Sequence, residues 1–303
     1  MHYNLLILSM SCNDPFFEES RNVTHDTWAK DIIDGVYDGL GFYSYTASKN
    51  GTEYIENNTI YLNCSDEIES TYYKTIRCFE FLRENDITFD YVLRTNTSVY
   101  FNIPLTIQMA NNKLSHGDFD FYTHRRGTHK FIVDEYECNI DEFHGSFYIA
   151  SHDFIYTLVD NYDIYNEGNE RVIQIFSILG FGIVGYDDIT MNVIRFLLEF
   201  DGIGKFKMIF DTNNMPRYKC VIKSRVALKN EFGISSHEQF SEESLYTIRM
   251  LNTDEPDVIN FIPFIQYRTL TSLSNRKSTK YRYIELEHAY ELHEACRYTH
   301  KNT

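Results

Sequence analysis

Two adjacent aspartates, Asp187 and Asp188, follow the turn-forming residue Gly185 and open a stretch with helical spacing. A carboxylate presented into a cleft from the start of a helix can act as a general base, because it can take the proton of a hydroxyl whose oxygen attacks carbon. The same pattern is typical of a helix N-cap, in which Asp187 only bonds the backbone of the helix that runs through Arg195. Alone, the pair favours capping; together with the segments described below, it favours catalysis by Asp188.

Polar side chains follow two runs that the pattern predicts as buried strands. The run Tyr3–Ser9 passes into Ser11, and Phe89–Leu93 runs directly into the polar segment 94–98. In an open α/β sheet the ligand lies beyond the carboxyl ends of the strands, so a ligand is expected first at these two places.

Within the polar segment 94–98, Asn96 and Ser98 could position a ribose or sugar hydroxyl, and Arg94 could supply positive charge. Ordinary turn chemistry, in which such side chains bond nearby backbone amides, is the alternative for Asn96 and Ser98.

The charge of the chain is uneven. Its 28 basic and 44 acidic residues give a formal net charge of −16, which opposes nonspecific binding of nucleic acid by the molecule as a whole. Residues 205–229 nevertheless hold seven basic side chains and one acid, and residues 266–283 hold five basic side chains and no acid. The first stretch could balance the charge of a diphosphate through Lys219, Lys223 and Arg225. The second could contact nucleic-acid phosphates through Arg276, Lys277 and Lys280. A solvated surface is the alternative for the first stretch.

Strands alternate with helices over the first 200 residues. Hydrophobic patterning predicts strands at Tyr3–Ser9, Gly41–Tyr45, Thr59–Leu62, Phe89–Leu93, Phe119–Thr123 and Phe147–Ala150. It predicts helices at Phe16–Lys30, Thr71–Asn85, His152–Asn161 and Asp188–Glu199. This order predicts an α/β sandwich with a mostly parallel central sheet.

The run His124–His129 has no zinc-site spacing, and we expect it to be a basic loop at a cleft.

Four segments, in order along residues 5–192, resemble the β-1,3-galactosyltransferase and Fringe family of GT-A glycosyltransferases. Arg21 to Trp28 resembles the family's Arg-x-x-Ile-Arg-x-Thr-Trp, and Lys74-Thr75 followed by the strand into residues 94–102 resembles its Lys-Thr helix, strand and three-acid motif. The segment Gly145 to Ser151 resembles the acceptor-side Gly-Gly-Gly-Tyr-Val-Leu-Ser, and Asp187 to Met191 resembles the Asp-Asp-x-Thr-Val motif that supplies the base.

The resemblance implies a GT-A-like, Rossmann-type sandwich over residues 1–200, with residues 201–303 as a C-terminal extension of the same domain. It implies an inverting transfer of a sugar from a nucleotide sugar, a UDP-sugar above all, with Asp188 as base and Asp187 beside it. Together with the strand ends and the basic stretch described above, it gives Ser9, Ser11, Arg21, Lys74, Arg94, Asn96, Ser98, Lys223 and Arg225 as the expected donor-binding residues, and Gly145 and Ser146 would lie on the acceptor side.

One departure from the family concerns the metal. Where the family has three acids that hold a divalent cation, this chain has Asn96, Thr97 and Ser98. Neutral amide and hydroxyl groups are poor ligands for Mg²⁺ or Mn²⁺, so we expect no metal site and no required cofactor. Basic side chains would then balance the charge of the leaving diphosphate.

The chain has 303 residues, of which 43% are hydrophobic and 24% charged, which indicates a folded globular protein. Its six scattered cysteines are typical of reduced thiols. No apolar run is long enough for a membrane span, and the first residues form a strand pattern rather than a signal peptide, so we expect a cytoplasmic protein with no membrane partner.

The acceptor is the most open question. An Asn-, Tyr- and Lys-rich composition with one Trp indicates an AT-rich genome such as that of a large bacteriophage, and phages of the T-even type glycosylate hydroxymethylated cytosine in their DNA. Modified DNA is therefore placed slightly ahead of a glycan or protein acceptor. Loss of the three acids leaves open a catalytically inactive relative that binds sugar nucleotide or glycan, and the net charge disfavours a structural nucleic-acid-binding protein.

Overall fold

The computed structural model describes residues 1–211 apart from gaps at 27, 98, 102, 104–106, 108–118, 134, 182–183 and 186, together with residues 261–263. The chain divides into two compact units. The first comprises Met1–Pro15, Tyr37–Asn96 and Asp118–Thr212, and the second comprises Phe16–Val36, Thr97–Gly117 and Asn213–Thr303. The expected division of the chain near residue 200 stays a prediction.

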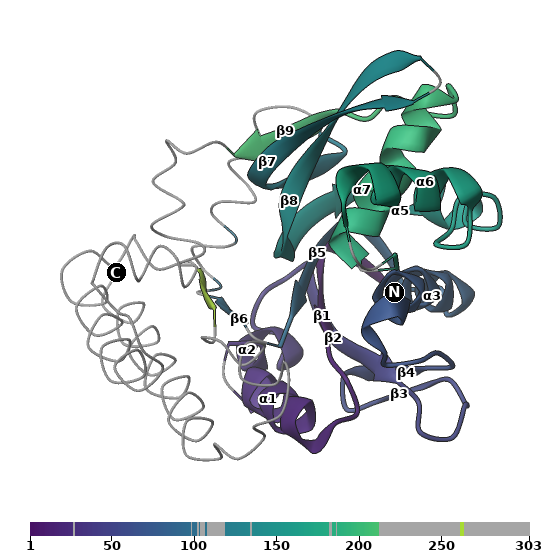
Figure 1. Ribbon diagram of the computed structural model, residues 1–303. Coiled ribbons are helices and arrows are strands. Elements are labelled where there is room, and N and C mark those ends of the chain that lie inside the picture. Colours follow the sequence, from purple (N-terminus) through teal and green to yellow (C-terminus); the bar gives the residue numbers. More distant parts are fainter. Residues whose placement is uncertain are drawn as a thin grey trace, which may run out of the picture. The chain divides into compact units, whose positions relative to one another are not determined.

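The first unit is built on a mixed sheet (Figure 1). Its strands in the described chain are β1 (His2–Met10), β2 (Leu40–Ala47), β3 (Tyr54–Glu56), β4 (Thr59–Leu62), β5 (Thr88–Asn96), β7 (Phe121–Val133), β8 (Tyr136–Ser151) and β9 (Met208–Asp211). They lie in the order β3-β4-β2-β1-β5-β8-β7-β9. The block β4-β2-β1-β5 is parallel throughout, whereas β8 runs antiparallel to both β5 and β7. The predicted α/β class with a mainly parallel centre is confirmed.

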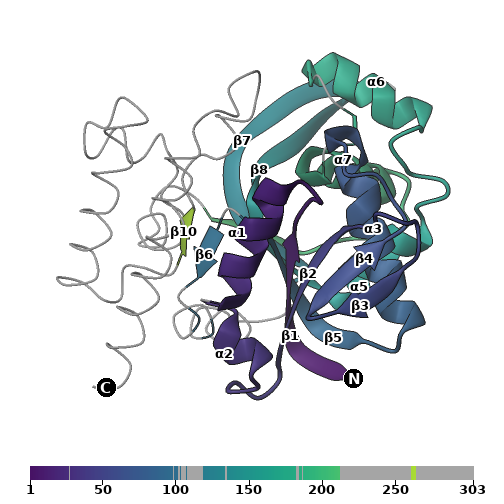
Figure 2. The ribbon, with the colours of Figure 1, turned by 90° about the horizontal axis from the view of Figure 1, so that it is seen from below.

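Helices of the first unit lie together on one face of this sheet (Figures 1 and 2). They are α3 (Thr71–Glu84), which follows the 3₁₀ turn η1 (Ile68–Ser70), α5 (His152–Asp160), α6 (Glu170–Leu179) and α7 (Asp187–Phe200). Alternate strand residues such as Leu6, Leu8 and Val92 pack with buried helix residues in one hydrophobic core, because strand side chains alternate between the two faces.

Local sequence explains the bounds of these helices. In α3 the buried side chains recur at helical spacing, as in Tyr72, Ile76 and Phe79. Helix α6 begins after Asn169, whose side chain accepts from the amides of Arg171 (2.9 Å) and Val172 (3.3 Å), and it ends at Gly180 in the left-handed conformation. The sequence analysis did not predict this helix.

The second unit holds α1 (most of Pro15–Asp26), α2 (Lys30–Ile33) and the antiparallel strand pair β6 (Val99–Phe101) and β10 (Phe261–Pro263). Trp28, the one tryptophan of the chain, is buried and packs edge-on against Phe101 with ring centroids 5.0 Å apart.

No helix in the described chain combines the length and the hydrophobicity needed to cross a membrane.

Candidate active site

The carboxyl ends of β1 and β5 form the point at which the order of the strands reverses. From β1 the chain proceeds to β2 and β4 on one side, and β5 then pairs on the other side of β1, with Met10 opposite Asn96 and Ser9 opposite Thr95. Crevices beyond such a switch point are where open α/β sheets bind their ligands. This edge of the sheet is therefore the candidate site.

Residues 94–96 belong to β5 and not to the loop that the sequence predicted. Arg94 pairs with Leu8 of β1 on one side and with Tyr148 of β8 on the other, and Thr95 is likewise paired on both sides. Pairing on both sides extends the strand to Asn96 despite its polar sequence. The prediction that the strand ends at Leu93 was wrong, because β5 continues to Asn96; Thr97 belongs to the second unit and Ser98 lies outside the described residues.

Arg94 is fully buried, with 1% of its surface exposed, and lies two residues after Val92 on the same face of β5. Its Nε donates to the Tyr45 hydroxyl (3.3 Å), and its guanidinium carbon lies 5.9 Å from the ring centroid of Tyr148. Tyr45 and Thr75 are hydrogen-bonded at 3.0 Å, and Thr75 donates to the carbonyl of Thr71. Hydrogen bonds therefore link the buried cation of β5 to the first turn of α3.

A row of small hydroxyl side chains crosses the parallel block in register. Thr59 lies opposite Ser44, Ser44 opposite Ser9, and Ser9 opposite Thr95, and all four are buried. The Ser9 hydroxyl oxygen has no hydrogen-bond partner within the described part of the chain. Buried polar groups are nearly always hydrogen-bonded, so Ser9 belongs to a small set of exceptions among the described residues, which also includes Thr46 of β2.

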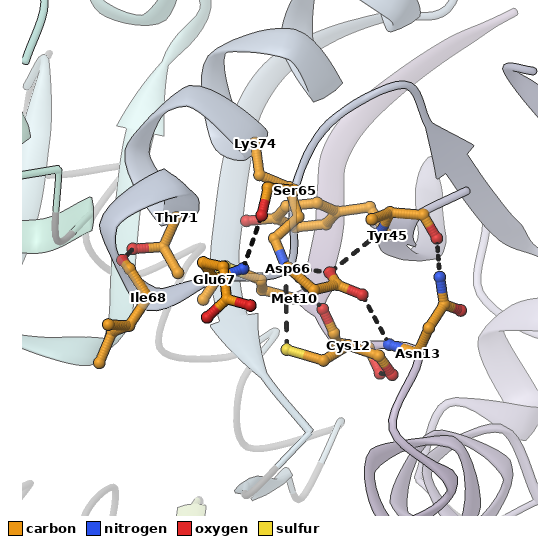
Figure 3. A network of polar contacts seen from close by, with 12 residues as sticks. Met10, Cys12, Asn13, Tyr45, Ser65, Asp66, Glu67, Ile68, Thr71 and Lys74 are labelled. Atoms are coloured by element: carbon orange, nitrogen blue, oxygen red, sulfur yellow. Dashed lines mark hydrogen bonds and ion pairs between the residues drawn. The ribbon is translucent and has the colours of Figure 1, made fainter. Parts of the chain in front are cut away.

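The segment after β1 is held by Asp66 and Lys74 (Figure 3). Lys74 comes from the second turn of α3 and donates to the Ser11 carbonyl (3.0 Å) and to Asp66 Oδ1 (2.7 Å). The same carboxylate accepts from the amides of Asn13 (2.8 Å) and Ala47 (3.2 Å), which follow β1 and end β2. The predicted residues Ser11 and Lys74 are thus in direct contact, and Asp66, which the sequence analysis missed, ties Lys74 to Asn13 and Ala47.

The acceptor-side segment runs along the end of β5. Because β8 is antiparallel to β5 and Phe147 lies opposite Thr95, the backbone of Gly145 and Ser146 continues past the carboxyl end of β5.

Helix α7 begins at Asp187, so Asp187 and Asp188 are its first two residues, at the positive end of the helix dipole. The preceding Gly185 has φ +94°, and its carbonyl accepts from the Tyr72 amide (2.9 Å) and from the Thr71 hydroxyl (3.1 Å). Its own amide donates to the Thr190 hydroxyl (2.9 Å). Gly185, which precedes α7, is therefore hydrogen-bonded to the first two residues of α3. Lys74 of the same helix donates to the Ser11 carbonyl after β1.

Arg21 lies in α1 of the second unit and is buried, with its Nη2 4.0 Å from the Glu18 carboxylate. One turn on, burial and, after it, the neighbouring charge of Arg21 together lower the pKa of His25 to about 4. A neutral imidazole is therefore the folded form of His25 at neutral pH.

Other predicted residues lie elsewhere. The run His124–His129 belongs to β7 and is not a loop, because the strand continues to Val133 through a register shift near Arg125, with Phe131 and Val133 buried. The predicted cationic residues Lys219, Lys223, Arg225, Arg276, Lys277 and Lys280 lie outside the described residues. Among the residues that the structure describes, no three His, Cys, Asp or Glu side chains form a group that could hold a metal ion.

Comparisons with known proteins add little beyond the fold. No protein-family model matches the chain, and no curated protein matches it. Among solved structures the chain is similar to a glycosyltransferase involved in the glycosylation of the major capsid of PBCV-1. The two superpose with a TM-score of 0.42 at 11% sequence identity, over 95% of this chain and 98% of that one. A likeness at this level carries no information about reaction or substrate.

Proposed function

We propose that the chain is an inverting glycosyltransferase that moves a sugar from a nucleotide sugar, a UDP-sugar above all, to an acceptor hydroxyl. One observation carries the proposal. Three of the segments that resemble a glycosyltransferase family belong to one unit although they lie far apart in the sequence: Lys74-Thr75 with residues 94–96, residues 145–151 and residues 187–191. Lys74 reaches the segment after β1, residues 147–151 pair with β5, and Gly185 before α7 is hydrogen-bonded to the start of α3.

In the proposed reaction, Asp188 takes the proton of the acceptor hydroxyl while the hydroxyl oxygen forms a bond to the anomeric carbon. The bond from that carbon to the diphosphate oxygen breaks on the opposite face, and its electron pair leaves with the nucleoside diphosphate. Asp187 orients its neighbour or the end of the helix. Lys219, Lys223 and Arg225 stabilise the leaving diphosphate in place of a divalent cation.

The proposed acceptor is hydroxymethylated cytosine in phage DNA. The basic segment 266–283, interleaved with Tyr267, Tyr281 and Tyr283, supplies the kinds of residues that contact phosphates and stack on bases. A buried base would have to be reached through the major groove or flipped out of the duplex. A glycan or protein acceptor is the competing class.

An inactive relative that binds sugar nucleotide is the second candidate function. The replacement of the family's three acids by Asn96, Thr97 and Ser98 is the observation that favours it.

Mass spectrometry of hydroxymethylated DNA incubated with the protein and a panel of UDP-sugars tests the proposed transferase activity. A mass increase of one sugar per modified base is expected. Donor binding without transfer to DNA, glycan or water would leave the inactive relative instead.

A further inference from the structure

The ammonium group of Lys74 is fully enclosed by protein acceptors. The side chain has 0% of its surface exposed, and its Nζ lies 3.0 Å from the Ser11 carbonyl, 2.7 Å from Asp66 Oδ1 and 3.8 Å from Cys12 Sγ (Figure 3). An ammonium group has three N–H donors and no acceptor. All three N–H donors of Lys74 therefore have protein acceptors, so its bonds stabilise the surrounding backbone of this chain.

Asp66 faces only donors. Its Oδ1 accepts from Lys74 and from the Ala47 amide, and its Oδ2 accepts from the Asn13 amide. A further hydrogen bond joins Asn13 to Ala47, from the side-chain amide to the carbonyl. The residue thus joins the segment after β1, the end of β2 and helix α3, and it keeps 23% of its side-chain surface exposed.

The two residues fix the backbone at the switch point of the sheet. The segment from Ser11 to Asn13 leaves β1 beside the end of β5, where the crevice of an open α/β sheet lies. A backbone segment held in one conformation before binding spares the ligand the cost of ordering it.

We propose that Asp66 and Lys74 are positioning residues that hold the segment 11–13 in the conformation that receives the nucleoside diphosphate of the donor. The inference rests on the proposed function. In this inference neither Lys74 nor Thr75 contacts the donor. Lys74 donates to the Ser11 carbonyl after β1, and Thr75 is hydrogen-bonded to Tyr45, which accepts from Arg94 of β5.

Two near-isosteric substitutions test the pair. In Lys74→Met the Ser11 carbonyl loses its ammonium donor. In Asp66→Asn the new NH₂ group must face a donor whichever way the amide is turned, because Lys74 and two backbone amides surround it. Arg77→Met is the matched control: it removes an ion-paired cation one turn further along α3, whose ion-pair partners are Glu53, Glu80 and Glu84 and not residues of the segment 11–13.

The first readout is amide hydrogen exchange at Asn13 and Ala47 in the full-length protein, and the second is the affinity for UDP by calorimetry. We expect exchange at both amides to rise about tenfold or more in both variants. In Asp66→Asn both amides lose a charged acceptor, and in Lys74→Met the Asp66 carboxylate that accepts from them loses its ion-pair partner. We expect the UDP dissociation constant to rise by a similar factor, with less than about a twofold change in Arg77→Met.

The outcomes separate this inference from the proposed function. Unchanged amide exchange in both variants would show that Asp66 and Lys74 do not hold the segment 11–13, whether or not UDP binds. Faster exchange with unchanged UDP affinity overturns the positioning role and leaves the pair structural. Wild-type protein that binds neither UDP nor any UDP-sugar overturns the proposed donor, and with it the positioning role, while the exchange data still decide whether the pair holds the segment.

Discussion

Gly185 lies directly against the backbone of Glu69. A Cβ built on Gly185 would come within 1.8 Å of the Glu69 carbonyl oxygen, and the φ of Gly185 is +94°. Both facts require glycine, since a side chain would be strained by the backbone conformation and would also collide with a backbone atom that cannot rotate away. The turn that leads into Asp187 and Asp188 therefore depends on one residue.

We expect Gly185→Ala to destabilise the protein by about 3 kcal/mol or more, from the left-handed conformation together with the overlap. Gly202→Ala is the matched control, because Gly202 has φ +73° and a Cβ added there would meet nothing within 4 Å. It should cost only about 1–2 kcal/mol. Urea unfolding of both variants measures the difference, and equal losses would show that the contact with Glu69 is not a constraint.

Asp188→Asn should lower transfer or donor hydrolysis by about 10²–10⁴ while UDP binding persists, because that range is the usual contribution of a general base. Asp187→Asn should have a milder effect. Single-turnover rates with a labelled UDP-sugar measure both, with UDP calorimetry as the control for folding. Turnover of Asp188→Asn within threefold of the wild type would remove Asp188 from the role of base.

Catalysis should not require a divalent metal. In the proposed correspondence with the family, Asn96, Thr97 and Ser98 replace three carboxylates that hold the ion, and neutral groups bind Mg²⁺ or Mn²⁺ weakly against water. Activity should persist in excess EDTA and fall strongly in Lys223→Ala. If EDTA silences the wild type and Mn²⁺ restores it, metal independence is wrong and Asp187 becomes the ligand to test.

Neutralising Arg276, Lys277 and Lys280 together should weaken binding to duplex DNA and flatten its dependence on salt. Each lost phosphate contact reduces the slope of log K against log salt concentration by about 0.9. Fluorescence anisotropy over a range of salt concentrations gives the slope. An unchanged slope would favour a glycan or protein acceptor.

Stability should fall as the pH drops from about 6.5 to about 4, in part through His25. Burial, and after it the charge of Arg21, lowers the pKa of His25 in the folded protein from 6.5 to about 4. Between these values the unfolded chain binds the proton and the folded chain does not, so acid favours unfolding.

His25→Gln removes this titration and should flatten the dependence of the free energy of unfolding on pH by up to about 3 kcal/mol across that window. Urea titrations at pH 7, 5.5 and 4 measure the effect. Parallel curves for the wild type and His25→Gln would mean that the ring is protonated in the folded state as readily as in the unfolded one.

Much of the central fold could be predicted from the sequence. The strand Thr59–Leu62 and the helix at Thr71–Asn85 were predicted almost to the residue, because their apolar side chains recur at the periods of strand and helix. The paired strands β7 and β8 were predicted only over Phe119–Thr123 and Phe147–Ala150. The polar, basic run His124–His129 has no strand pattern and was predicted as a loop, although β7 continues through it to Val133.

The candidate site was predicted in part. Ser9, Ser11, Lys74 and Arg94 do gather at the ends of β1 and β5, but the sequence gives no sign of Asp66. An aspartate before a helix is typical of a turn or a cap, and its three donors come from segments that only the tertiary fold brings together.

The order of the strands also decides when this edge of the sheet can form during synthesis. Strand β5 pairs with β1 from the start of the chain and with β8 at Phe147–Ser151, so its two neighbours leave the ribosome at widely separated times. Such non-local pairing makes folding slow, because a long loop must close before the pairing is gained. The edges of β1 and β5 are therefore exposed in the growing chain, and a chain that stops before residue 151 cannot complete the site.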